Sequence, residues 1–168
     1  TRYIGVTGVQ TCALPISFGS YKTLLAGNYL PAMSYVIKLD KIREVGAWTS
    51  GNTIEDWEMW LKLSKNYKFA YIDEPVAFYR WHDSNTCKTM KFELVRDSIQ
   101  LFENEREYAL NRGYENIFYS TLVNMIIQLR IHDKTLFIKK FFKYSINPAF
   151  ICAFTIKIFN KIKKSIKY

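Results

Sequence analysis

Two adjacent acids, Glu55 and Asp56, stand at the start of the apolar run in the stretch TIEDWEMWLKL. The spacing of the apolar residues predicts a helix over residues 55–65, in which successive side chains lie about 100° apart. On this helix Asp56 points to the same side as Trp60 and Leu63, whereas Glu55 points to the polar side. An ionised carboxylate that is held still in this way can serve as a general base.

The same spacing also fits a purely structural role for the acids. Thr53 could be the N-cap of the helix and Asp56 could occupy the third helical position, as in a capping box. A carboxylate in the first turn is favoured by the helix dipole by roughly 0.3–1 kcal/mol. The two roles are compatible, because a helix N-terminus keeps an acid ionised.

Alternating and helical hydrophobic patterns predict the elements that position this pair. A short strand and a short helix precede it, a pair of strands follows it, and a helical region completes the chain. The predicted elements before the acidic pair are a strand at 34–40, a short helix within 41–48 that Gly46 ends, and a loop at 49–52. Those after it are strands at 67–73 and 76–82 separated by Glu74 and Pro75, helices at 89–111 and 116–131, and two more helical stretches broken at Asn147 and Pro148.

Charge and composition exclude several classes of protein. The chain has a net charge of +9, but residues 134–168 hold nine lysines and no acid, and without them and Arg2 there are 14 basic and 15 acidic side chains. A globally basic nucleic-acid-binding protein is therefore not indicated. Cys87 and Cys152 are far apart and form no zinc motif. No apolar run reaches the ~18 residues that indicate a membrane span.

The first residues have a separate explanation. The stretch VTGVQTCALPI (Val6 to Ile16) matches the translation of a common sequencing-library adapter, and residues 1–5 fit the upstream adapter and its index. We therefore expect residues 1–17 to be an artefact and leave them out of the fold prediction. Native sequence would then begin near Phe18, in a truncated gene fragment.

From Gly27 to Lys88 the chain resembles the second half of a family 2 glycosyltransferase with the GT-A fold. The matching strings are GNYLPAMSYVIKLDKIREVGAW, EDWEMWLKLSKNYKFAYIDEP and FYRWHDSNTCK. Their elements follow the family order: a strand, a short helix and an EVGGF-like turn, an acidic pair opening a helix, a strand with a YI-EP string, and a YR-H string before a polar loop. The resemblance covers around 60 residues.

The resemblance implies a reaction and its residues. In this family an acceptor hydroxyl attacks the anomeric carbon of a nucleotide-activated sugar in one displacement and inverts its configuration. Asp56 would be the base, and Glu55 would support the site. His82 matches a histidine that meets the metal or the donor diphosphate, and a divalent cation, Mn²⁺ or Mg²⁺, would neutralise the departing diphosphate. For His82 the alternative is a polar residue at a strand end.

Six more residues match positions where the family contacts its substrates. Arg80 could bind diphosphate or brace the acids, or be a surface arginine. The aromatic residues could form an acceptor wall, although core packing is at least as consistent with Trp57. The expected substrate-binding residues are Trp48, Trp57, Arg80, Gly27, Asn28 and Ser34.

Two departures from the family pattern limit the expected activity. The nucleotide-binding first half is missing, and after Phe18 there is neither an Asp-X-Asp motif nor a glycine-rich phosphate loop. The string YRWH also resembles the QxxRW motif of processive synthases, but the glutamine position is Ala77. We therefore expect a non-processive transferase, of which the fragment alone would be inactive.

The C-terminal stretch, residues 147–168, interleaves phenylalanine, isoleucine and lysine. Phe150, Phe154, Ile158 and Ile162 recur at a spacing of four and are predicted to form one apolar helix face, with most lysines elsewhere. Such a helix fits an anionic membrane surface. The alternative is a helix packed on its predecessors with a solvated lysine face.

Together these patterns predict an α/β protein with the C-terminal half of a truncated GT-A domain (Rossmann-like nucleotide-diphospho-sugar transferase) and a helical extension. The expected ranges are 1–17 adapter, 18–88 catalytic half and 89–168 extension with a basic amphipathic end. The parent enzyme would work in cell-surface polysaccharide synthesis on a glycan or lipid-linked acceptor. It would be cytoplasmic, at the inner face of the plasma membrane. The alternative is a non-enzymatic module that binds a membrane surface or a partner.

Overall fold

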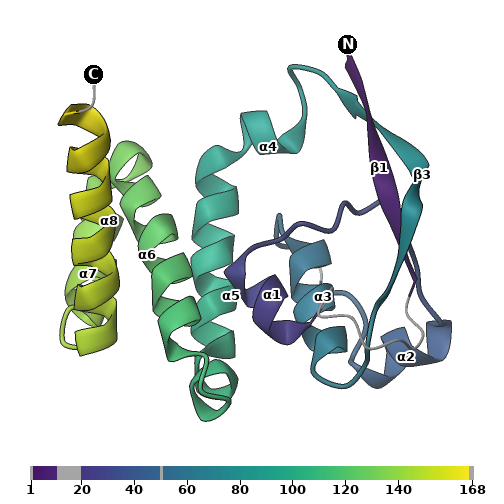
Figure 1. The fold of residues 1–168 in the computed structure, drawn as a ribbon, viewed down its shortest axis with the longest axis horizontal. Helices are drawn as coiled ribbons and strands as arrows, with labels where there is room; N and C mark the ends of the chain where they lie inside the picture. The colour runs from purple at the N-terminus through teal and green to yellow at the C-terminus, as the bar shows by residue number, and fades with distance from the viewer. Residues whose placement is uncertain (1, 11–19, 50, 167–168) are drawn as a thin grey trace. The chain divides into compact units, whose positions relative to one another are not determined.

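The structure is a computed structural model that describes residues 2–10, 20–49 and 51–166 of the chain. The chain divides into two compact units, residues 1–94 and 95–168. Within the described residues, eight helices account for most of the chain, and three strands form one small sheet in the first unit (Figure 1).

The sheet has the strand order β2-β1-β3. Its central strand, β1 (Arg2–Gln10), runs antiparallel to β3 (Ala70–Trp81) and pairs in parallel with the two-residue β2 (Tyr35–Val36). Residues 2–10 belong to the segment that the sequence analysis left out as adapter. Leaving them out removed the central strand, so the observed sheet could not be predicted. The adapter origin of these residues stays a prediction.

The predicted fold class, an α/β truncated GT-A half, is wrong. A Rossmann-like half requires several parallel strands joined by helical crossovers. Here parallel pairing is confined to the two residues of β2, and the described chain is mainly helical. The strand predicted at 34–40 is cut short because Leu39 already begins a helix.

The two strands predicted at 67–73 and 76–82 are a single strand, β3, and Pro75 lies within it. Proline cannot donate a ladder hydrogen bond and is tolerated at strand irregularities. The pairing register between β1 and β3 shifts on both sides of Thr7, the residue opposite Pro75. This irregularity explains why a proline does not divide the strand.

Trp57 anchors the helical part of the first unit. The helices are α1 (Tyr21–Ala26), α2 (Leu39–Glu44), α3 (Glu55–Ser64) and α4 (Thr86–Thr89). Trp57 on α3 is buried against α1 and donates its indole N–H to the Leu24 carbonyl at 2.8 Å. Trp60 is also buried and meets the rings of Tyr35 and Phe69 edge to face, at 4.4 and 6.4 Å between ring centroids. The predicted apolar side of residues 55–65 is thus confirmed as a core-facing surface.

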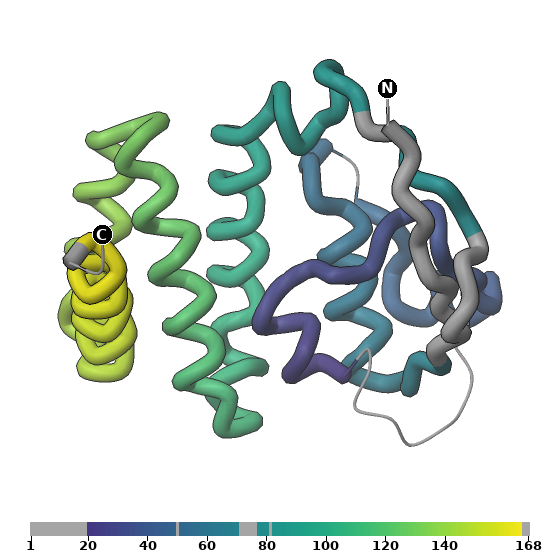
Figure 2. Tube along the Cα trace, turned by 45° about the horizontal axis from the view of Figure 1, so that its top comes forward, coloured from purple at the N-terminus to yellow at the C-terminus, as the bar shows by residue number. Residues whose placement is uncertain are grey.

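The helices of the C-terminal region agree with their predicted positions. They are α5 (Lys91–Asn111), α6 (Glu115–His132), α7 (Lys134–Tyr144) and α8 (Pro148–Ile166). Figures 1 and 2 show α5 and α6 side by side, and Phe102 stacks on Phe118 between them at 5.4 Å. None of the described helices is long and apolar enough to cross a membrane.

A network of charged side chains joins α5 to α7 in the second unit. The Glu103 carboxylate accepts hydrogen bonds from Lys140 at 2.8 Å, Lys143 at 2.7 Å and the Tyr144 hydroxyl at 2.8 Å. Burial opposes ionisation of Glu103, but these three donors outweigh it and lower its pKa to about 2. The ionised carboxylate is therefore part of the packing between the two helices.

We expect Ala47→Gly to stabilise the fold. Ala47 follows α2 with a φ of 58°, in the left-handed region where a Cβ is strained. Glycine relieves that strain but loses more entropy on folding, so a net gain of about 0.5–1 kcal/mol should appear in urea unfolding. Ala32→Gly is the control, because Ala32 is exposed and lies outside the left-handed region. An unchanged or lower stability in Ala47→Gly would contradict the strained geometry.

We expect Glu103→Gln to destabilise the protein by about 1–2 kcal/mol at neutral pH. Because the folded-state pKa of Glu103 is lowered, its contribution is full above the unfolded pKa near 4.5 and is lost as the pH falls towards about 2. The difference in unfolding free energy between wild type and variant should shrink over this range. Glu107→Gln, an exposed change of the same kind on the same helix, is the control.

Candidate functional site

Helix α3 begins one residue later than the capping prediction requires. Its N-cap is Ile54, whose backbone N–H donates to the Asn52 side-chain carbonyl at 3.0 Å. The prediction of Thr53 as N-cap is therefore wrong, and Asp56 occupies the second helical position instead of the third. Asn52 holds the entry to the helix because an Asx turn can form just before it.

The Asp56 carboxylate is held at both oxygens. Oδ1 accepts from the Trp57 backbone N–H at 2.6 Å, and Oδ2 accepts from the Asn28 side-chain amide at 3.3 Å. Asp56 is half-buried and Glu55 is exposed, so the two acids have the different surroundings that helix geometry predicts. Each carboxylate oxygen can accept more than one hydrogen bond, so Asp56 keeps acceptor capacity for a ligand.

Asn28 is itself oriented by the backbone. Its side-chain oxygen accepts from the Leu30 N–H at 3.2 Å, which leaves its amide nitrogen directed to Asp56. A flipped amide would place two acceptors against each other at Asp56 and lose both bonds. The structure thus brings together two residues, 28 positions apart, that the sequence analysis assigned to one site.

A cavity of about 570 Å³ lies beside this pair. Asn28, Glu55 and Asp56 contribute polar groups to its wall, and Tyr29 and Tyr79 contribute aromatic rings. Small-molecule sites are concave pockets of ~300–1,000 Å³ with a few convergent polar groups in a mainly apolar lining. The cavity therefore has the size and composition of a ligand site.

Tyr35 is a site residue that the sequence analysis missed. Burial, and then the negative charges of Asp56 and Glu55, raise the pKa of its phenol. Its ring packs on Trp60 at 4.4 Å, which fixes it beside the acids. No local pattern distinguishes Tyr35 from other strand tyrosines; only the three-dimensional contact with α3 does.

Glu58 fixes the loop that precedes α3. Its carboxylate accepts from the Thr49 hydroxyl at 2.7 Å and the Asn52 amide at 2.9 Å, and it pairs with Lys62 at 2.8 Å. Burial opposes ionisation of Glu58, but these donors outweigh it and lower its pKa. Glu58 thus positions the loop that leads into the acidic helix.

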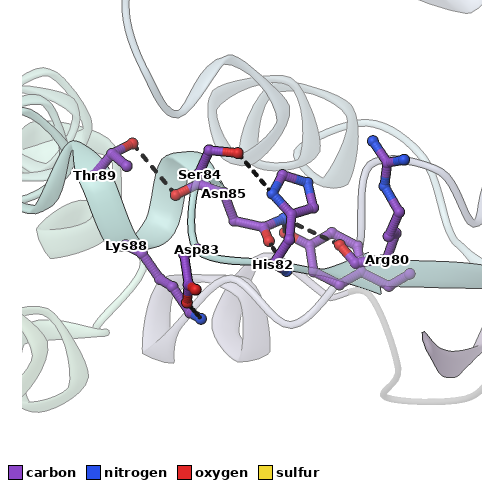
Figure 3. A network of polar contacts seen from close by, with 8 residues as sticks. Arg80, His82, Asp83, Ser84, Asn85, Lys88 and Thr89 are labelled. Atoms are coloured by element: carbon purple, nitrogen blue, oxygen red, sulfur yellow. Dashed lines mark hydrogen bonds and ion pairs between the residues drawn. The ribbon is translucent and has the colours of Figure 1, made fainter. Parts of the chain in front are cut away.

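His82 belongs to a separate polar network at the end of β3 (Figure 3). Its Nδ1 lies 2.8 Å from the Ser84 hydroxyl, and its backbone N–H donates to Asn85. The Asn85 amide donates to the Tyr79 hydroxyl at 3.0 Å and to the Arg80 carbonyl at 3.2 Å. Tyr79 lines the cavity, so this network is connected to the cavity wall through one hydroxyl.

The remaining predicted substrate residues lie outside the cavity lining. Trp57 is in the core, which was the alternative for it, and its ring cannot reach a sugar. Ser34 is 2% exposed and donates its hydroxyl to the Pro31 carbonyl at 2.9 Å. Gly27 caps α1. Trp48 and Arg80 are exposed, and Arg80 contributes its carbonyl to the His82 network.

The described residues do not by themselves fit a divalent cation. Within residues 2–10, 20–49 and 51–166, no three His, Cys, Asp or Glu side chains gather closely enough to hold one. Asp83, next to His82, pairs with Lys88 at 2.9 Å. A hard cation needs several oxygen ligands. The expected Mn²⁺ or Mg²⁺ site at His82 stays a prediction, and no step is derived through it.

Comparison of the chain with protein-family models, with curated proteins and with solved structures found no match.

We expect Asp56→Asn to lower the pKa of Tyr35 towards its ordinary value, because one of the negative charges that raise it is removed. Part of the elevation should remain, since burial also raises it. The measurement is an NMR titration of ¹³Cζ-labelled tyrosine, with Tyr35→Phe to assign the signal. Asp83→Asn, a change outside the cavity lining, is the control. An identical Tyr35 titration in Asp56→Asn would show that the two side chains are not neighbours.

Proposed function

We propose that the protein takes part in sugar transfer, as part of an inverting, non-processive glycosyltransferase in cell-surface polysaccharide synthesis. The donor would be a nucleotide sugar and the acceptor a glycan or a lipid-linked glycan. The observation that carries the proposal is the Asp56 carboxylate, which is held by Asn28 on the wall of a ligand-sized cavity. The order of motifs from Gly27 to Lys88 supplies the reaction class.

In the proposed reaction Asp56 accepts the proton of the acceptor hydroxyl. The hydroxyl oxygen then attacks the anomeric carbon of the donor, and the bond from that carbon to the diphosphate breaks with its electron pair leaving on the phosphate oxygen. Attack opposite the leaving group inverts the configuration. A base must lie within hydrogen-bonding reach of the proton it takes, and Asp56 lines a cavity of about 570 Å³, a size that supports binding of a sugar beside it.

Neighbouring side chains support the base in different ways. Asn28 donates its side-chain amide to Oδ2 of Asp56, which orients the carboxylate at the cavity wall. Tyr29 and Tyr79, in place of the predicted Trp57, could pack their ring faces on the acceptor sugar. Glu55 lies at the rim, where its charge would bias the cavity towards neutral hydroxyl groups and away from anionic acceptors.

The donor side and the location of the reaction remain expectations of the resemblance. Donor diphosphate, and a divalent cation with it, would meet His82 and Arg80. The proposal places the protein in the cytoplasm, peripheral on the inner face of the plasma membrane. The anionic lipid of that leaflet attracts basic segments, which supports this location for a chain with a lysine-rich end.

The test is nucleotide-sugar turnover by the protein expressed from the complete gene of the source genome. Loss of a general base typically costs about 10²–10⁴-fold in rate, so Asp56→Asn should lower kcat by that amount while the protein stays folded by circular dichroism. Asn28→Ala should lower kcat less, because it removes only the support of the base.

Asp40→Asn is the matched control, because it removes an exposed carboxylate from the same unit outside the cavity. It should leave turnover unchanged. A folded Asp56→Asn protein with full turnover would contradict the assignment of Asp56 as the base. Asp56 would then have only a structural role in α3.

A further inference from the structure

Helix α8 is packed over its first two turns. Phe150 is fully buried, with its ring centroid 6.3 Å from that of Tyr119 and 5.7 Å from that of Tyr144. Phe154 meets Phe141 at 5.0 Å. The face of α8 that carries Phe150 and Phe154 is therefore turned to the other helices of this unit.

The predicted apolar face does not continue along this packed side. Side chains four residues apart on a helix are displaced by about 40°, so the series from Phe150 to Ile162 rotates steadily around the helix. Ile158 is 39% exposed and Ile162 is 53% exposed, whereas Phe150 is buried. The prediction of one face shared by these residues is therefore corrected: the series begins in the core and ends in solvent.

Four of the exposed apolar residues of α8 form a second apolar face, which we define as Ile151, Ile158, Phe159 and Ile162; Ile156 is also exposed but lies about 60° beyond this face. On the helical wheel they lie within a third of a turn, on the side away from Phe150. Phe159 is the most exposed of them, at 65%. Apolar side chains exposed in a row are unusual on a surface that only faces water and indicate an interaction site.

In the later turns of α8, lysines lie on the side that carries Phe150 and Phe154 in the first turns. Lys157 and Lys161 come seven residues after Phe150 and Phe154, about 20° away on the wheel. Within the described residues, no carboxylate pairs with the lysines of α8, and Glu103 already binds Lys140 and Lys143. The end of α8 is thus apolar on one side and carries Lys157, Lys161 and Lys164 on the other, while Lys163 borders the apolar face about 40° from Phe159; none of these lysines has a neutralising acid among the described residues.

This combination selects one kind of partner. A second copy of the chain would cover the apolar face but leave the lysines, on the other side of α8, without a counter-charge. A nucleic acid would neutralise the lysines and leave the isoleucines in water. An anionic lipid surface satisfies both sides, because it takes up the apolar face and lies within a Debye length, about 10 Å, of the lysines.

We propose that α8 docks the protein on anionic membrane, lying in the plane of the surface with Ile151, Ile158, Phe159 and Ile162 against the lipid. The geometry matches that of an interfacial helix, which inserts its apolar face by about 5–10 Å. The first turns of α8 stay in the bundle, so the docking end is fixed to folded protein. The inference stands independently of sugar transfer.

The test is co-sedimentation of the whole chain with phosphatidylcholine vesicles, with and without about one third phosphatidylserine. Wild type should pellet with the anionic vesicles and release as salt rises. Phe159→Ser/Ile162→Ser should weaken binding by at least about ten-fold, because two exposed apolar anchors are lost. Lys161→Gln/Lys164→Gln should weaken it by about five-fold per lysine on anionic vesicles only.

Matched substitutions elsewhere in the chain test whether vesicle binding depends on this face of α8 or on any exposed phenylalanine or lysine. Phe78→Ser removes an even more exposed phenylalanine from β3, and Lys68→Gln/Lys91→Gln removes two exposed lysines from outside α8; both variants should bind as wild type. Undiminished binding of Phe159→Ser/Ile162→Ser would overturn the proposal. A second outcome would also overturn it. If the wild type self-associated without lipid in sedimentation velocity, and Phe159→Ser/Ile162→Ser abolished this association but left vesicle binding unchanged, the face would be the contact with a second copy.

Discussion

The hydrogen bond from the Trp57 indole to the Leu24 carbonyl is the contact on which the first unit depends. It joins α3 to the end of α1 in the core, where an unpaired indole N–H would cost about 1–3 kcal/mol. Asp56 precedes this tryptophan and Asn28 follows α1, so the same contact brings carboxylate and amide together. The cavity beside them is therefore a consequence of core packing.

The helices were predictable and the sheet was not, for one physical reason. A helix can be predicted from the local spacing of apolar residues, and this spacing over residues 89–166 predicts the positions of α5 to α8. A sheet depends on pairing between distant segments, here β1 with β3 across some 60 residues or more. Removing residues 1–17 from consideration also removed the central strand. The fold class inferred by resemblance then implied a parallel sheet, whereas parallel pairing within the described residues is limited to β1 with the two-residue β2.

At the candidate site, local geometry accounts for one residue and tertiary contact for the others. The direction of Asp56 follows from its place on α3, and its bond to Asn28 joins two residues that resemblance had grouped. Tyr35, Tyr79 and the bracing role of Glu58 depend on how separate segments meet, which no spacing in the sequence reveals. The N-cap was misplaced because Asn52 holds the turn before α3 and Ile54 takes the cap position.

The cavity wall also carries a sulfur atom. Cys87 on α4 lines the cavity and is exposed with a free thiol. A molecule bound beside Asp56 would shield that thiol from alkylating reagents, so its modification rate reports occupancy without any assay of turnover. The native chain thus contains a built-in chemical footprinting probe, with the exposed thiol of Cys152 on α8 as an internal reference in the same sample.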